Sequence, residues 1–466
     1  MNFFRKIDYE NTSSSIICDN HIYSYKDLFY DIKNFNFLAD QKSLVFIISE
    51  NNYECLAAYS GVSYFDSVVL LLDQSIKQEA LNNLINKFKP SYIFQNTSRM
   101  TLGNWEVVFE FGVYCFYSIG YVKDYSIYKD LSLLLPTSGT TGSPKCVRLS
   151  YSNIYSNTVA ICSSLNISSS DKVITTLPMS YSYGLSIINT HLFSNSSLIL
   201  TNLSFAQRAI WDKIKSLKVT TFGGVPYTYK LLKKLKFSRL NIDSLDYITQ
   251  AGGKIDYDTL NYFTKVCKEK KIKFFVMYGQ TEASPRMSFL PPKMIETKAG
   301  SIGTPIQGGK FSLLKDKNDE EGELVYEGEN VCMGYAFDKS DLKKKNENNG
   351  VLKTGDIAKV DKDGFYFITG RKKRILKLYG NRLNLDFVEN EIQKQGLNCV
   401  CLGNDTELKI FTTNKNYVKD INNYLINKLN VSKYMFNLYL VKKIPRNSSG
   451  KIIYSQIEES NSEKIK

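Results

Sequence analysis

The feature that most constrains this chain is the alternation of short apolar runs with amphipathic stretches of helical period through its first three hundred residues. The apolar runs are short enough for buried strands, and strands separated by helices of this length favour parallel sheets. We predict strands at 43–49, 66–73, 91–95, 172–178, 196–201, 219–226, 244–253 and 273–279, and helices at 23–39, 52–65, 79–88, 184–193, 206–216 and 256–270. The pattern predicts an α/β protein.

From Gly308 onward the pattern changes to short strands with tight turns, at 310–316, 322–328 and a hairpin around DKDG at 358–368. A basic stretch at 371–374 then leads into a compact βα segment. The sequence therefore predicts a large N-terminal lobe over residues 1–370, with mixed or parallel sheets and a β-rich subdomain. A small α+β C-terminal lobe is expected over 371–466.

The composition indicates an intracellular protein. The N-terminal residues lack the apolar core of a secretory signal, and no apolar run approaches the roughly 18 residues that cross a bilayer. The nine cysteines are scattered, and the closest pair, Cys399 and Cys401, has no second pair at zinc-finger spacing. We expect reduced thiols, a cytoplasmic location and no membrane span.

The chain has only two histidines, His21 and His191. A Ser–His–Asp hydrolase, a Cys–His protease or a multi-histidine metal site would have to be built from these two. His191 lies in an apolar, helix-like run, where we expect a packed core histidine rather than a catalyst. The chemistry must therefore use lysine, carboxylates, backbone amides and a bound ion.

The positive charge is concentrated near the C-terminus. The formal net charge is +14, and residues 371–466 contain 18 Lys or Arg against nine Asp or Glu. Clustered positive charge steers an anionic partner, which could be nucleic acid, an acidic protein or a phosphorylated cofactor. The alternative is that a Lys-rich composition makes the whole chain basic.

The strongest local signal is the segment LSLLLPTSGTTGSPKCVRLS. An apolar strand at 131–135 leads into a loop of small and hydroxyl residues, followed by a second strand. Small residues let backbone amides converge on an anion, while hydroxyls and a lysine add donors and charge. The spacing is not that of a Walker loop, and a polar surface loop is the alternative. The predicted phosphate loop comprises Thr137, Ser138, Gly139, Thr140, Thr141, Gly142 and Lys145.

Eight motifs in order resemble those of the adenylate-forming enzymes, which include acyl-CoA synthetases, luciferases and the adenylation domains of peptide synthetases. They are TSGTTGSPK, LPMSYSYG, AGGK, YGQTE, GELVYEGENVCMGY, KTGD, GRKKRILKLYGNRLNL and NSSGK, and they span essentially the whole chain. The resemblance implies a ligase that uses ATP and Mg²⁺. A carboxylate attacks the α-phosphorus, pyrophosphate leaves, and a thiol then displaces AMP from the acyl-adenylate.

The resemblance also implies roles for residues around the nucleotide. Tyr278 would stack on adenine, and Thr281 would offer its hydroxyl to the α-phosphate. Glu282 is a hard oxygen ligand suited to Mg²⁺. The glycines expected beside the nucleotide are Gly252, Gly253 and Gly279.

Further expected roles lie toward the C-terminus. Asp356 would accept the ribose hydroxyls, with Arg371 as a second ribose or phosphate contact. Lys451 would bridge the attacking carboxylate and the α-phosphate. In the family the C-terminal lobe rotates between the two steps, which places a hinge at Lys373. After rotation, Lys377 and Gly380 would line a tunnel for the pantetheine thiol.

The acid pocket departs from the family pattern. Ser180 and Tyr181 stand where acyl-CoA synthetases usually have an aromatic residue and a histidine, and Gly184 belongs to the same pocket motif. No acid occurs near Ser182, which argues against an α-amino acid substrate. Arg286 falls in a stretch that lines the pocket in relatives. A buried guanidinium needs an anion, so the substrate would carry a second acidic or polar group. Alternatively, Arg286 pairs with a protein carboxylate or points outward.

We therefore expect a two-lobe ligase that passes an acyl group to the pantetheine of CoA or an acyl carrier protein, and the wide basic excess of the C-terminal lobe favours the carrier protein. The alternatives within the class are amide formation with an amine and stand-alone amino-acid activation. Outside it remain a nucleic-acid-binding protein that uses the basic lobe and an inactive scaffold of the same fold. Intact Lys451, Glu282 and Asp356 argue against the scaffold.

Overall fold

The computed structural model describes residues 2–99, 105–120, 124–136, 145–317, 319–378, 381–404, 406–429, 431–446, 452–457 and 462–465. It consists of two compact units. The first unit comprises Met1–Lys310 and Tyr326–Leu352, and the second comprises Phe311–Val325 and Lys353–Lys466. The lobe boundary predicted at residue 371 falls inside the second unit, and it stays a prediction.

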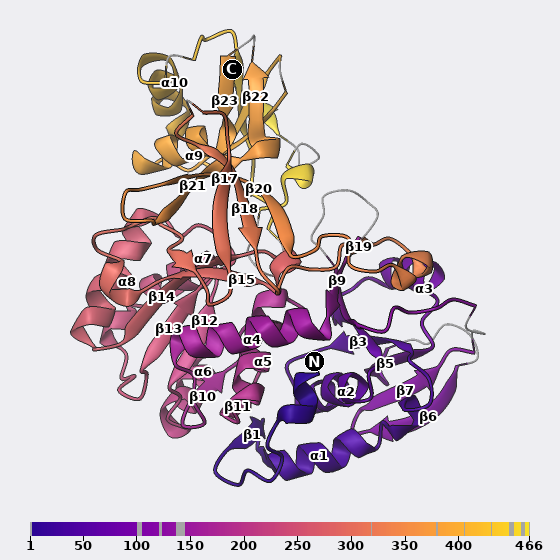
Figure 1. Cartoon of the computed structure of the whole chain (residues 1–466). Helices are drawn as coiled ribbons and strands as arrows, with labels where there is room; N and C mark the ends of the chain where they lie inside the picture. The colour runs from indigo at the N-terminus through magenta and orange to yellow at the C-terminus, as the bar shows by residue number, and fades with distance from the viewer. Residues whose placement is uncertain are drawn as a thin grey trace. The chain divides into compact units, whose positions relative to one another are not determined.

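The first unit contains a nine-stranded sheet with parallel strands at its centre (Figure 1). β10 (Lys172–Ile174), β12 (Thr221–Gly224), β13 (Tyr247–Gln250) and β14 (Lys273–Gly279) run parallel, as do β11 (Ser197–Leu200) and β1 (Ser15–Cys18). The antiparallel strands β15 (Arg286–Leu290) and β16 (Thr304–Pro305) form one edge, and β2 (His21–Ser24) forms the other. The β14–β15 hairpin brings two of the predicted site segments together.

The second sheet of this unit has eight strands, in the order β19-β9-β8-β4-β3-β5-β7-β6. β3 (Leu44–Ser49), β4 (Val68–Asp73), β5 (Tyr92–Asn96) and β8 (Leu131–Pro136) are parallel. The antiparallel strands are β6 (Glu106–Phe111), β7 (Tyr114–Ser118), β9 (Cys146–Ser150) and the two-residue β19 (Tyr335–Ala336).

Helices cover both sheets of the first unit. They are α1 (Tyr25–Lys33), α2 (Tyr53–Tyr64), α3 (Gln78–Phe88), α4 (Tyr151–Leu165), α5 (Ser182–Phe193), α6 (Arg208–Ser216), α7 (Pro226–Lys234) and α8 (Tyr257–Glu269). One hydrophobic core includes β3 and β4 of one sheet, β11 of the other, and residues of α2, α4 and α5. Nearly every residue of α2 and α5 is buried, so both helices lie inside this core.

The second unit contains two small sheets and a hairpin. One sheet comprises β17 (Lys310–Leu314), β18 (Gly322–Glu327), β20 (Val351–Val360) and β21 (Tyr366–Arg371). The other comprises β24 (Val400–Gly403), β25 (Leu408–Thr412), β26 (Phe436–Leu440) and β27 (Glu463–Lys464). β22 (Ile375–Leu378) pairs with β23 (Asn381–Asn384), and α9 (Leu385–Lys394) and α10 (Tyr417–Asn427) share a core with the second sheet.

Short 3₁₀ helices connect these elements: η1 (Phe3–Lys6), η2 (Asn36–Leu38), η3 (Phe237–Arg239), η4 (Thr281–Ala283), η5 (Pro292–Met294), η6 (Lys339–Lys343), η7 (Lys372–Arg374) and η8 (Tyr454–Gln456). The predicted α/β class is confirmed, with parallel strands where helices separate them. The hairpins β1–β2 and β6–β7 were not predicted. Among the described residues, no helix is both long and apolar enough to cross a membrane.

Candidate active site

The phosphate-loop motif lies between two strands that hold its ends together. β8 and β9 pair antiparallel, with Pro136 opposite Cys146, which confirms that a strand follows the loop. The predicted loop residues Thr137, Ser138, Gly139, Thr140, Thr141 and Gly142 lie outside the described residues. Lys145, at the end of the loop, is described. Its Nζ lies 3.8 Å from the centre of the Tyr335 ring, so the cation faces the aromatic surface.

The YGQTE motif begins with the last two residues of β14, Tyr278 and Gly279, and turns through η4. Gly279 is required by packing, because a Cβ at this position would lie 1.7 Å from the Pro285 carbonyl oxygen. The Thr281 hydroxyl lies 3.0 Å from the Ser182 hydroxyl at the start of α5. The YGQTE turn and the start of α5 therefore lie in contact.

Glu282 is held by a residue from a third motif. The Tyr335 hydroxyl donates to Glu282 Oε1 at 2.9 Å, and burial and the Glu282 charge both raise the pKa of Tyr335. Tyr335 therefore stays protonated and serves as a donor. Lys145, Glu282 and Tyr335 thus meet from distant parts of the sequence and provide a cation, a carboxylate and a positioning ring.

The carboxylate of Glu282 suits Mg²⁺, which in nucleotide sites is bound by one or two carboxylates together with substrate phosphates. Across the described residues, no cluster of three or more His, Cys, Asp or Glu side chains forms a dedicated metal cage. Glu282 would hold the ion together with the nucleotide. Bound Mg²⁺ would neutralise phosphate charge at this site.

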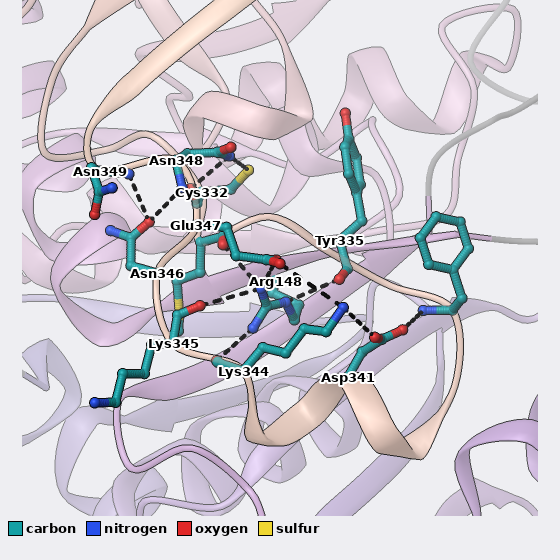
Figure 2. Close-up of polar contacts among 12 residues, drawn as sticks. Arg148, Cys332, Tyr335, Asp341, Lys344, Lys345, Asn346, Glu347, Asn348 and Asn349 are labelled. Carbon is teal, nitrogen blue, oxygen red and sulfur yellow. Dashed lines mark hydrogen bonds and ion pairs between the residues drawn. The ribbon is translucent and has the colours of Figure 1, made fainter.

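The segment that bears Tyr335 is anchored by Arg148 of β9, which is buried (Figure 2). Gly334, at φ +121°, lies against this guanidinium, where a Cβ would come 2.5 Å from the Glu347 carboxylate. The guanidinium therefore fixes a long connection to the strand that follows the phosphate loop. Arg148 donates to the carbonyl oxygens of Met333, Tyr335, Lys344 and Lys345 and to the carboxylate of Glu347.

The AGGK turn lies beside the pocket motif. Gly252 has φ +83°, and a Cβ there would lie 2.4 Å from the Tyr181 hydroxyl. Gly253 follows in the same turn, where a Cβ would lie 3.3 Å from the Pro226 ring. Gly184 allows α5 to approach the preceding loop, because a Cβ would come 2.3 Å from the Pro178 carbonyl oxygen. The Tyr181 hydroxyl thus lies against the glycine turn, and its place in an acid pocket stays a prediction.

Arg286 and His191 line one small cavity between α5, β12 and β13. Arg286 is only 2% exposed, so its side chain does not point outward. Among the described residues it also forms no ion pair with a carboxylate, so both alternatives considered for this residue are excluded there. His191 is 3% exposed, and burial lowers its pKa to about 3. The expectation of a packed core histidine is therefore confirmed.

The predicted ribose residues lie together in the second unit. Asp356 and Arg371 are cross-strand partners in β20 and β21, and Arg371 Nε lies 3.1 Å from Asp356 Oδ1. Asp356 is 3% exposed, whereas the Arg371 side chain is 63% exposed. The buried carboxylate is thus oriented by the exposed guanidinium.

The predicted hinge residue lies between two anchored neighbours. Lys372 forms an ion pair with Glu323 of β18 at 2.7 Å. On the other side, Arg374 forms ion pairs with Asp386 at 2.5 Å and with Glu389 at 2.6 Å, both in α9. Lys373 therefore separates a residue fixed to the β17–β21 sheet from one fixed to α9.

Three further predicted residues cannot be placed by their side chains. Lys377 lies in β22 opposite Arg382, and only its backbone is described. Gly380 and Lys451 lie outside the described residues. An isolated bridge between Arg446 and Ile452 joins the two ends of the NSSGK loop.

Sequence reasoning missed the roles of Tyr335, Ser182 and Arg148. Tyr335 ends the motif GELVYEGENVCMGY, and its position there was the only available signal. Around Ser182, sequence reasoning used only the absence of an acidic residue. Arg148 lies in an apolar strand, where an arginine is unusual. That position could have indicated a structural role for Arg148 from the sequence alone.

Comparisons with known proteins give a sequence family and several relatives. The sequence model of the family described as "AMP-binding enzyme" matches residues 11–336. A 2-succinylbenzoate–CoA ligase of Bacillus velezensis is 30% identical over 251 residues, which cover 53% of this chain and 50% of the relative. A ligase of the same name from Bacillus cereus is 24% identical over 439 residues, with 89% of this chain and 88% of the relative covered.

The fold matches a solved structure of O-succinylbenzoate coenzyme A synthetase from Bacillus subtilis in complex with ATP and a magnesium ion. The TM-score is 0.77 and the identity 21%, and the match covers 98% of this chain and 99% of the other. At this identity the likeness establishes the two-domain fold.

Proposed function

The chain belongs to the AMP-binding enzyme family, and from this premise we propose that it is an AMP-forming ligase that joins a carboxylic acid to the thiol of CoA. The meeting of Lys145, Glu282 and Tyr335 beside the contact between Thr281 and Ser182 carries the proposal. The lysine, the hydroxyl groups and the carboxylate that can hold Mg²⁺ suit the negative charge and the hydrogen-bond acceptors of a nucleoside triphosphate. The names of the relatives supply the acid and the acceptor class.

In the first step, an oxygen of the substrate carboxylate attacks the α-phosphorus of ATP, and the bond to the pyrophosphate oxygen breaks. Such reactions depend mainly on positioning and charge neutralisation. Thr281 would donate its hydroxyl to the α-phosphate, and Glu282 would hold Mg²⁺. Lys145 contributes positive charge, and Lys451 approaches the attacking carboxylate.

The nucleoside would be held by Tyr278, which stacks on adenine, and by Asp356, which accepts the ribose hydroxyls. Arg371 already orients the Asp356 carboxylate at 3.1 Å. This arrangement supports the ribose role that the KTGD motif implies.

In the second step, the thiol sulfur attacks the acyl carbon of the adenylate, and AMP leaves. We propose that the segment from β22 onward rotates about Lys373 between the two steps, so that Lys377 and Gly380 line the thiol path. The ion pairs of Lys372 and Arg374 to different elements support this hinge, because backbone rotation at Lys373 leaves both intact.

The names of the relatives support CoA as the acceptor, in place of the carrier protein that the basic C-terminal charge favours, and they do not support an amine. A standard α-amino acid remains disfavoured, because Ser182 contacts Thr281 where an amino-acid enzyme would have an acid. The nine unpaired thiols fit a cytoplasmic location.

The test is acid-dependent pyrophosphate release, followed by thioester formation with CoA, across a panel of carboxylic acids. We expect pyrophosphate release only with acid, ATP and Mg²⁺ present together, and the thioester only after CoA is added. Glu282→Gln should abolish both. Pyrophosphate release without any acid, or no release with the whole panel, would contradict the proposal.

A further inference from the structure

The segment that carries Tyr335 is a compact loop whose two ends meet. The Glu347 amide donates to the Met333 carbonyl oxygen at 2.9 Å, which closes residues 333–347 into one loop. Its regular elements are β19, with two residues, and η6, with five. So little regular structure leaves backbone carbonyl groups that need hydrogen-bond donors from elsewhere in the protein. Compact closed loops of this size frequently serve a function.

Arg148 of β9 supplies these donors from a fully buried position (Figure 2). At one end of the loop its guanidinium donates to the carbonyl oxygens of Met333 at 3.0 Å and Tyr335 at 3.1 Å. At the other end it donates to the Lys344 carbonyl oxygen at 2.6 Å and pairs with the Glu347 carboxylate. A guanidinium has five N–H donors in a planar fork, so one side chain can hold both ends of the loop.

The backbone of Arg148 holds the same loop end as its side chain. The Arg148 amide donates to the Gly334 carbonyl oxygen at 2.9 Å, and the Arg148 carbonyl oxygen accepts from the Met333 amide at 2.8 Å. Residues 333, 334 and 335 are thus each bonded to Arg148. The backbone of Tyr335 is therefore fixed by β9, independently of what its side chain contacts.

The Tyr335 side chain depends on this fixed backbone because it makes two contacts at once. Its hydroxyl donates to Glu282 Oε1 at 2.9 Å, and its ring centre lies 3.8 Å from Lys145 Nζ. A side-chain hydrogen bond is lost by about 3.6 Å, so a backbone shift of about 1 Å would release Glu282. The Cys332 amide, just ahead of the loop, also donates to the Glu282 carbonyl oxygen at 2.8 Å. The position of the Glu282 carboxylate thus depends on the 333–347 loop.

An arginine that only stabilises the fold is the alternative. Burial of a guanidinium is costly, however, and apolar residues of similar volume commonly replace buried ion pairs without loss of stability. Arg148 also lies three residues after Lys145, so one short segment contacts Tyr335 at two points, its ring and its carbonyl oxygen. The bonds of Arg148 thus gather around the residue that contacts Glu282, as a role in the site requires.

We propose that Arg148 is a positioning residue for the metal: through Tyr335 it holds the Glu282 carboxylate where Mg²⁺ and the nucleotide bind. The inference rests on the proposed ligase function and adds a residue that none of the eight motifs contains. Arg148 is fully buried, so it contributes geometry rather than a direct contact. Its loss should therefore raise the Mg²⁺ concentration that nucleotide binding requires and leave the acid site unchanged.

The test is a double-mutant cycle between Arg148→Lys and Tyr335→Phe. Lysine keeps the charge but has one nitrogen, which cannot bond both ends of the loop. ATP binding would be measured by calorimetry, without acid, at a series of free Mg²⁺ concentrations. We expect Arg148→Lys to raise the Mg²⁺ concentration for half-maximal effect about three- to tenfold, but less than about twofold in the Tyr335→Phe background. An equal shift in both backgrounds, no shift in either, or ATP binding that does not respond to Mg²⁺ in the unaltered protein would overturn the proposal.

A second variant disturbs the same contact without removing the arginine. A Cβ at Gly334 would lie 3.0 Å from Arg148 Nη2, so Gly334→Ala should displace the guanidinium and raise the Mg²⁺ requirement in the same direction. If Arg148→Lys does not fold, Gly334→Ala takes its place in the cycle. The matched control is Arg208→Lys, because the Arg208 side chain is 93% exposed on α6. Thermal unfolding measures stability separately, and a variant that loses stability but keeps the original Mg²⁺ requirement would overturn the proposal.

Pyrophosphate release separates this inference from the ligase function. With saturating ATP and Mg²⁺, KM for the acid should be the same in Arg148→Lys and the unaltered protein, and a shift in this KM alone would overturn the positioning role. If no acid releases pyrophosphate but the cycle is non-additive in ATP binding, the ligase proposal fails and the positioning role stands. If pyrophosphate is released and the two substitutions shift the Mg²⁺ requirement independently, the ligase function stands and the positioning role is overturned.

Discussion

At the scale of single residues, the cavity between α5, β12 and β13 contains two basic side chains that respond to burial in opposite ways. Burial lowers the pKa of His191 to about 3, so this side chain is neutral and no charge is buried there. Arg286 cannot do so, because guanidinium deprotonates only far above neutral pH. The two residues line the same cavity, and only one of them keeps a charge there. A charge retained in this way is expected to reduce stability and serve ligand binding.

His191→Asn should change how stability depends on pH. The pKa of His191 in the folded state is about 3, below the ordinary value of 6.5. Between these two pH values the imidazole is protonated in the unfolded chain and neutral in the folded chain. Stability should therefore fall as pH falls below about 6.5, at up to about 1.4 kcal/mol per pH unit. Urea unfolding of the variant from about pH 8 to 5 should lack this slope. His21→Asn, on exposed β2, is the control.

Arg286→Met should stabilise the ligand-free protein. A buried charge that lacks a counter-ion is costly, and replacement by an apolar side chain of similar volume is commonly neutral or stabilising by about 1–4 kcal/mol. Urea unfolding without ligand would measure the change. A loss of more than about 1 kcal/mol would instead make the hydrogen bond to Ser186 a structural requirement.

At the scale of helices and strands, the sequence predicted long elements well and short contacts poorly. The helix predicted at 184–193 is α5, which begins at Ser182, and the strands around the phosphate loop were both predicted. β19 has only two residues, too few to show a period, so the position of Tyr335 beside Glu282 could not be predicted. The unpaired state of Arg286 depends on which side chains surround it in three dimensions, and sequence spacing does not specify that.

Two substitutions at Tyr335 should separate its two contacts. Tyr335→Phe removes the hydrogen bond to Glu282 but keeps the ring beside Lys145, so the Mg²⁺ concentration needed for half-maximal rate should rise several-fold. Tyr335→Leu removes both contacts and should also raise KM for ATP. Steady-state titrations of Mg²⁺ and ATP would measure the two effects. Tyr434→Phe, at an 83% exposed tyrosine, is the control, and equal effects of the two Tyr335 variants would contradict the division of roles.

At the scale of the whole molecule, the groups proposed for the first half-reaction are divided between the two units. The first unit holds Thr281, Glu282 and Lys145, whereas the second unit holds Asp356, Arg371 and Lys373, the residue proposed as the hinge. A ligase with two steps can keep the acyl group in one binding site and bring different residues of the C-terminal segment to that site in each step. The anchored neighbours of Lys373 fit such an exchange.

Two substitutions in the C-terminal segment should affect different half-reactions. Lys451→Ala should reduce adenylation by about 10²–10³, because it removes a cation aimed at developing charge, while supplied acyl-adenylate is still converted to thioester. Gly380→Leu should spare pyrophosphate exchange and block thioester formation, because a branched side chain would fill the thiol path. Single-turnover assays of each half-reaction would measure both. Equal damage to both half-reactions by either variant would contradict the rotation about Lys373.

The basic charge of residues 371–466 should act on the acceptor step alone. CoA and an acidic carrier protein are both anionic, so the encounter should slow as salt rises from about 0.05 to 0.3 M, where the screening length shortens from about 14 to 6 Å. Charge reversal at the exposed Lys442 and Lys443 should likewise slow thioester formation and leave pyrophosphate release unchanged. CoA and a carrier protein would be compared at matched concentration. If the rate of thioester formation with CoA changes with neither salt nor the two charge reversals, the basic excess reflects only the Lys-rich composition. The thiol would then reach the acyl-adenylate without electrostatic guidance.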